Sequence, residues 1–164
     1  MNRHIVSLAA MLLGINVADA AQTIRFAGGR AAVPLPDAFK VTTNADGLEA
    51  RFGAKGDHLL QLTLLQVIEG RDGMTDKASM FVKIQAEKKG ARLQRSGDRA
   101  AFMETGAQEK RGATTFQAAH WQIGIGNCLF TMTLTAPLPM SSDLDAFLGE
   151  PLNAIVNEMS CAAP

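Results

Sequence analysis

The chain has 164 residues, of which 47% are hydrophobic, and it carries 16 basic and 16 acidic side chains. This length is sufficient for one domain with a substantial core. The neutral charge balance gives no electrostatic reason to expect nucleic acid or an anionic membrane as a partner.

The first twenty residues are typical of a cleavable secretory signal. Residues 2–4 supply a positive start, residues 5–17 an apolar stretch, and residues 18–20 an A-x-A cleavage site. The alternative is an uncleaved membrane anchor, but a bilayer span needs about 20 apolar residues. We therefore predict a signal peptide over 1–20 and one globular domain over 21–164, with no stable membrane anchor after cleavage. We expect a periplasmic location, with secretion as the alternative.

After the signal, period-2 patterns predict a series of strands. The predicted strands are 23–26, 31–35, 39–43, 48–52 and 59–68. Pro34 and Pro36 suit an edge strand, because proline cannot donate to a ladder. Asp46 and Gly47 predict a hairpin turn in which glycine supplies a positive φ.

A helix is predicted from Thr75 or Asp76 to Lys89, ended by Gly90. Its apolar residues at helical spacing define one face that packs against the rest of the domain; they are Ala78, Phe81, Val82 and Ala86. The basic cluster that follows is most simply a solvated helix end. This cluster comprises Lys88, Lys89, Arg92 and Arg95.

The C-terminal half returns to strands. We predict strands over 92–95 and 100–105, a polar turn over 106–112, and a hairpin of 114–125 with 128–135. Threonines alternate with apolar residues in the last strand, which indicates one solvated face. A final helix should begin at Ser141 or Ser142 and reach about Asn157, kinked or split at Pro151.

Two cysteines remain, Cys128 and Cys161. An even count in an exported protein predicts one disulfide, although two free buried thiols are the alternative. The strand 128–135 rises about 26 Å, and the following helix returns about 25 Å in the opposite direction. These lengths bring the cysteines together, so we predict a structural Cys128–Cys161 bond and no redox role.

The order strands, helix, strands, helix predicts an α+β fold, a mostly antiparallel sheet covered by helices. The segment Ala32-Val33-Pro34-Leu35-Pro36-Asp37-Ala38-Phe39-Lys40-Val41 resembles the opening of Mog1/PsbP-like proteins, including bacterial envelope members of the DcrB type. The succession of elements over residues 31–160 is similar as well. The resemblance implies an α/β/α sandwich used as an adaptor or accessory domain, with no catalytic residues. Relatives of DcrB type are lipoproteins, whereas this chain lacks a lipidated cysteine.

Few residues are suited to chemistry. After the signal the only histidines are His58, expected in an exposed turn, and His120, expected as a packed or solvent-facing strand residue. Neither has an obvious nucleophile nearby, and no cluster has metal-ligand spacing. We therefore predict no catalytic, cofactor or metal site and expect that the protein is not an enzyme.

Three functions remain open. The first is an exported accessory or adaptor protein that binds another envelope protein. The second is an immunity protein against a toxin delivered to the periplasm, and the third is a carrier of a small molecule or lipid. We expect no nucleic-acid partner.

Overall fold

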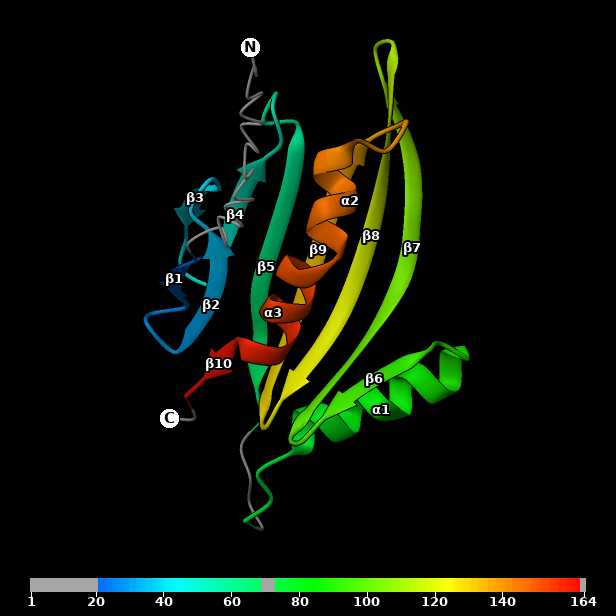
Figure 1. Cartoon of the computed structure of the whole chain (residues 1–164). Coiled ribbons are helices and arrows are strands. Elements are labelled where there is room, and N and C mark those ends of the chain that lie inside the picture. Colours follow the sequence, from blue (N-terminus) through cyan, green and yellow to red (C-terminus); the bar gives the residue numbers. More distant parts are fainter. Residues whose placement is uncertain (1–20, 69–72, 163–164) are drawn as a thin grey trace, which may run out of the picture.

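The structure is a computed structural model that describes residues 21–68 and 73–162; the predicted signal peptide lies outside these ranges. Its main feature is a seven-stranded sheet in which every neighbouring pair is antiparallel (Figure 1). Its strands, in spatial order, are β3 (Lys40–Thr43), β4 (Gly47–Phe52), β5 (His58–Val67), β9 (Cys128–Pro137), β8 (Thr114–Ile125), β7 (Arg99–Arg111) and β6 (Leu93–Ser96).

A second, three-stranded sheet contains β1 (Ala21–Phe26), β2 (Ala31–Pro36) and β10 (Ser160–Cys161), with β2 in the middle. The prediction that the proline-containing strand lies at an edge is therefore wrong. The structure tolerates prolines there because β10 pairs with only Ala31 and Ala32 of β2. Pro34 and Pro36 lie beyond that pairing, so no ladder with β10 is interrupted.

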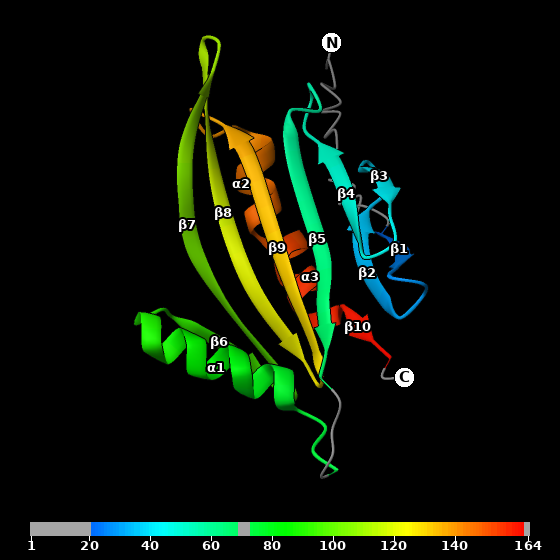
Figure 2. The ribbon, with the colours of Figure 1, turned by 180° about the vertical axis from the view of Figure 1, so that it is seen from behind.

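Helices lie on both faces of the large sheet (Figures 1 and 2). The pair α2 (Ser142–Leu148) and α3 (Glu150–Glu158) lies on one face, together with the small sheet, and α1 (Lys77–Lys89) lies on the other. The predicted α+β fold, a mostly antiparallel sheet covered by helices, is confirmed. Within the described ranges no helix is both long and apolar enough to cross a membrane.

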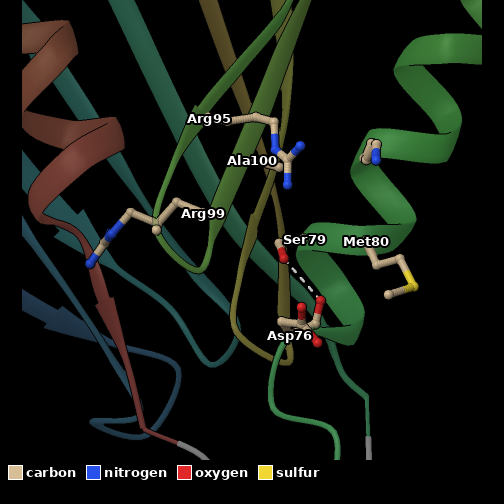
Figure 3. A pocket seen from close by; sticks show the side chains of 8 residues that line it. Asp76, Ser79, Met80, Arg95, Arg99 and Ala100 are labelled. Carbon is tan, nitrogen blue, oxygen red and sulfur yellow. Dashed lines mark hydrogen bonds between the residues drawn. The ribbon is translucent and has the colours of Figure 1, made fainter.

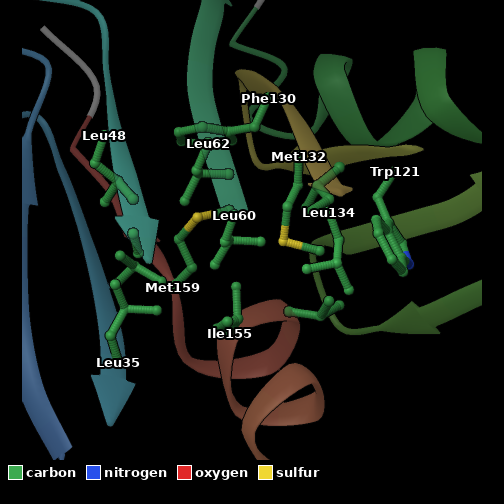
Figure 4. Packing of buried hydrophobic residues seen from close by; sticks show 14 of the residues in the cluster. Leu35, Leu48, Leu60, Leu62, Trp121, Phe130, Met132, Leu134, Ile155 and Met159 are labelled. Atoms are coloured by element: carbon green, nitrogen blue, oxygen red, sulfur yellow. The ribbon is translucent and has the colours of Figure 1, made fainter. Parts of the chain in front are cut away.

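The main core fills the space between the large sheet, α3 and β2 (Figure 4). Inward-facing side chains of β5 and β9, such as Leu60, Leu62 and Met132, are fully buried there against Ile155 and Met159. Each such side chain contributes about 1.5–3 kcal/mol relative to an exposed position. This burial fixes the register of the sheet, because a one-residue slip would turn the buried set outward.

A smaller core forms under α1. Ala78, Val82 and Ala86 form a seam of small side chains on the sheet. A Cβ at Gly124 of β8 would lie 2.5 Å from the backbone carbonyl of Ala78, so only glycine lets the helix approach this closely. Phe81, predicted on the packed face, is 39% exposed instead. It lies about 100° around the helix from Val82, on the edge that the narrow seam leaves uncovered.

Two turn predictions are wrong. Gly47 does not adopt a positive φ; the side chain of Asn44 shapes the turn by accepting the amides of Asp46 and Gly47. Gly47 is nevertheless required, since a Cβ there would lie 2.3 Å from a backbone oxygen of β5. Residues 106–111, predicted as a turn, continue β7 past a bulge between Thr105 and Gln108 and pair with β8.

The C-terminal predictions are confirmed. The last helix splits at Gly149, with Pro151 in the first turn of α3, and Ser141 caps α2 by accepting the amide of Leu144. Cys128 and Cys161 form a disulfide with their Cα atoms 6.3 Å apart. The bond links the start of β9 to β10 and so holds the C-terminus against both sheets.

Candidate functional site

Helix α1 covers only one end of its face of the large sheet, and among residues 21–68 and 73–162 no other element covers the rest of that face (Figure 2). We call this uncovered part the open face. A row of cross-strand neighbours crosses it; the row is Glu49, Gln61, Thr133, His120 and Glu104, from β4, β5, β9, β8 and β7. These residues lie on the side opposite the main core, because their strand neighbours Leu60, Leu62 and Met132 point inward.

Contacts within the row hold its side chains in place. Gln61 Nε2 donates to Glu49 Oε1 at 2.9 Å, and His120 Nδ1 lies 2.9 Å from Thr133 Oγ1. A Cβ at Gly106 would lie 2.5 Å from His120 Nε2, so this glycine gives the imidazole room to lie against β7. The row therefore offers a flat, ordered array of hydrogen-bonding groups. This is a surface suited to binding a polar partner rather than to chemistry.

One further polar contact ties the open face to α1. Lys89 Nζ donates to both carboxylate oxygens of Glu104 at 2.7 and 2.8 Å. Both side chains are about 40% exposed, so the pair contributes well under 1 kcal/mol. The pair matters for position rather than stability, because it joins the C-terminal end of α1 to the row of polar side chains that crosses the sheet.

The outer side of α1 is a second distinct surface. Met80, Phe81 and Ile84 are exposed there by 43%, 39% and 43%. A cleft of about 110 Å³ separates α1 from the β6–β7 hairpin. Figure 3 shows Arg95 reaching from β6 into the space beside Ser79 and Asp76 of the helix start, and Lys83 also lines this cleft. Apolar and basic side chains therefore lie together on this side of the molecule.

Sequence analysis missed a contact between His58 and Ser141. His58 is 2% exposed rather than in an exposed turn, because its ring packs 5.0 Å from that of Phe52. Ser141 Oγ lies 2.9 Å from His58 Nε2, and Asp57 Oδ1 lies 3.0 Å from Nδ1. No local signal predicted this, since the partners are 83 residues apart.

The serine, histidine and aspartate are the residue types of a hydrolase triad, but their contacts here are structural. Ser141 Oγ also accepts the Leu144 amide as the cap of α2. The Asp57 carboxylate is close to Nδ1 without meeting hydrogen-bond geometry, whereas a catalytic aspartate orients the imidazole through such a bond. The contact fastens the start of α2 to the start of β5.

A cavity of about 310 Å³ lies near this point, between α2 and the end of β4. Three phenylalanines line it, and their rings pack mainly on one another: Phe39 on Phe52 at 4.4 Å and Phe52 on Phe147 at 4.8 Å between centroids. Asp143 at the rim accepts the amide of Ala54 at 3.0 Å. A second hollow, of about 360 Å³, lies beside this cavity and is lined by His58 and Ser141, so neither hollow is singled out as the place for a carried small molecule.

The structure brings the two predicted disulfide residues together, but not the two histidines that were considered for chemistry. Cys128 and Cys161 bond to each other, His58 contacts Ser141, and His120 lies on the open face. Among residues 21–68 and 73–162, no group of three or more His, Cys, Asp or Glu side chains could hold a metal ion. The expectation that the protein has no catalytic, cofactor or metal site stays a prediction.

No protein-family model and no curated protein matches the chain. Among solved structures, the chain is similar to a protein from Bacteroides thetaiotaomicron, with a TM-score of 0.60 and 12% identity over 87% of this chain. The match covers 48% of that protein, so the chain spans about half its length. This likeness shows a shared fold.

Two further solved structures are similar to the chain. A cyanobacterial PsbP from Synechocystis matches at 11% identity over 91% of this chain and 96% of its own, with a TM-score of 0.39. LpqN of Mycobacterium tuberculosis, described as involved in cell envelope biogenesis, matches at 13% identity over 88% and 91%, with a TM-score of 0.42. No function follows from these two matches.

Proposed function

We propose that the protein is an exported, non-enzymatic accessory protein of the bacterial cell envelope that acts by binding another envelope protein. The signal-like residues 1–20 and the Cys128–Cys161 bond support export, since disulfides persist in oxidising compartments. The side chains best suited to catalysis are engaged in structural contacts. The proposal therefore rests on binding surfaces.

The observation that carries the proposal is the open face. An antiparallel sheet often leaves one face to solvent, but here hydrogen-bonded pairs such as Gln61–Glu49 and His120–Thr133 order the part of the face that α1 does not cover. The row, in which His120 is exposed and the other four side chains are half-buried, presents donors and acceptors at positions that its hydrogen bonds hold. Fixed polar groups favour a protein partner with complementary hydrogen bonds, because such groups gain little from contact with an acyl chain.

A matched pair of substitutions tests the proposal. Thr133→Arg places a bulky cation in the middle of the row, and Asn153→Arg places the same side chain on an exposed position of α3, on the opposite side of the sheet. The tagged protein is incubated with envelope extract of its host, and retained proteins are identified by mass spectrometry. We expect one envelope protein to be retained by the wild type and by Asn153→Arg, and lost with Thr133→Arg. Equal retention by all three forms would refute a role for the open face.

A further inference from the structure

Helix α1 has two apolar sides, although a helix at a protein surface ordinarily needs one. Ala78, Val82 and Ala86 form the seam on the sheet. The second side, formed by Met80, Phe81 and Ile84, faces solvent. Exposing three large apolar side chains on one side of a helix does not stabilise the free protein. The outer side of α1 therefore indicates a binding surface separate from the open face.

Basic residues surround this second side. Residues 76–95 contain six of the sixteen basic residues of the chain and only two of its sixteen acidic residues. Lys77, Phe81, Ile84 and Lys88 follow one another at helical spacing, so lysines stand at both ends of the apolar stripe. The rest of the chain has an excess of acidic residues, and the overall neutrality therefore conceals a strongly basic region.

The cleft beside α1 adds to the basic character. Lys83 and Arg95 line it, and within the described residues the side chain of neither one makes a hydrogen bond or ion pair. Asp76 also lines the cleft, whereas the guanidinium of Arg99 donates to the carbonyl of Met159. A phosphate group at this point would meet the two cations Lys83 and Arg95, whereas the hydroxyl of Ser79 already donates to the carbonyl of Asp76.

We propose that the outer side of α1, with Met80, Phe81 and Ile84, docks on a bilayer surface that contains anionic lipids. The three apolar side chains enter the boundary between headgroups and acyl chains, and the lysines extend to the lipid phosphates. Helix α1 stands at one end of the molecule (Figures 1 and 2), and its seam packs on β7 and β8, so its outer side can lie along such a surface. This docking is reversible and goes beyond the proposed function, which uses the open face.

Charge decides between the possible occupants of this surface. A second copy of the chain would bring two basic helices together, and their repulsion disfavours such a dimer. A protein partner would need an acidic surface with an apolar strip of matching length. A bilayer with anionic lipids supplies both negative charge and an apolar layer, whatever the orientation of the helix axis in the plane of the membrane. Basic amphipathic helices bind such bilayers for this reason.

Flotation with lipid vesicles tests the proposal. The protein starts at Ala21, which removes the apolar residues of the predicted signal and keeps every described element. We expect it to float with vesicles of phosphatidylglycerol and phosphatidylethanolamine at low salt, and not with vesicles of phosphatidylcholine alone. Raising the salt to about 0.5 M should release most of it, since the Debye length falls below about 5 Å.

Three variants locate the contact. Ile84→Glu and Lys88→Glu change the outer side of α1 without touching its seam, and each should lower partitioning roughly tenfold or more. Leu148→Glu is the matched control, because Leu148 is 38% exposed on α2 on the opposite side of the sheet. Thermal unfolding of each variant verifies that the fold is kept.

The outcomes are distinct from those of the open-face experiment. Unchanged flotation of Ile84→Glu, or an equal loss with Leu148→Glu, would overturn the proposal. The membrane-docking proposal would also be refuted if the wild type does not bind anionic vesicles while a photo-crosslinker at position 84 captures an acidic envelope protein. Loss of vesicle binding in Ile84→Glu with an unaltered protein partner would support docking by α1 and leave the open face as the protein-binding surface.

Discussion

Reduction of the Cys128–Cys161 disulfide should destabilise the protein by an amount that the structure allows to be estimated. The bond closes a loop with a sequence separation of 33 residues. The chain-entropy relation then gives a stabilisation of about 3.7 kcal/mol at 25 °C, through restriction of the unfolded chain. For a domain of this length, a loss of that size lowers the melting temperature by about 10–15 °C.

The reduced protein should nevertheless remain folded at 25 °C. Ile155 and Met159 are fully buried, so α3 should stay packed on the sheet when the disulfide is reduced. The Arg99 guanidinium also donates to the Met159 carbonyl. By contrast, β10 pairs with β2 through only two residues, so its position depends most directly on the disulfide.

Urea unfolding of the oxidised and the reduced wild type measures the effect without deleting any side chain. With a slope near 2 kcal/mol/M, the midpoint of the reduced form should lie about 2 M lower. A Cys128→Ala/Cys161→Ala variant should behave like the reduced form, apart from a small packing loss. A difference below about 1 kcal/mol, or complete unfolding of the reduced form, would refute the reasoning.

Three further predictions concern single contacts. Gly124→Ala should lower the free energy of unfolding by about 1–3 kcal/mol, because its Cβ would collide with the backbone of α1; an unchanged urea midpoint would contradict the close seating of the helix. Ser141→Ala removes a helix cap and the partner of buried His58, so a loss of about 1–3 kcal/mol is expected, whereas Ser141→Thr should retain most of the stability. The hydrogen bond from Arg111 lowers the pKa of Glu109, and Arg111→Ala should return that pKa to the ordinary glutamate range in an NMR titration. Any stabilisation from this pair is present at neutral pH and lost as the pH falls through that lowered pKa; because both groups are fully exposed, the melting temperature should not change.

Features set by neighbouring residues could be predicted from the sequence. The hairpin around Gly126 forms as expected, with a positive φ at that glycine. Gly90 ends α1 in the left-handed conformation that the sequence predicted. The cysteine pairing was predictable as well, because a strand and a returning helix of similar length place Cys128 and Cys161 on the same side of the domain.

Features that depend on distant partners were missed. Residues 106–111 begin with a glycine and are mostly polar, so their composition favours a turn, yet pairing with β8 makes them a strand. His58 lies beside a glycine and an aspartate, which suggested exposure, but Phe52 and Ser141 enclose it. The candidate surfaces belong to this second class, because the row through Thr133 exists only once five strands are in register.

Net charge also shows the difference between what the sequence predicts and what depends on the folded arrangement. A balance of 16 basic and 16 acidic residues predicts no attraction to an anionic surface, and that inference treats charge as evenly spread. Folding sets the basic residues of 76–95 on and beside one helix about 20 Å long, so that they can face the same surface together. When that helix comes within about one Debye length of a surface, its local excess of basic residues decides the interaction, and the acidic remainder of the molecule tends to turn away from the same surface. A neutral chain can therefore dock in a defined orientation.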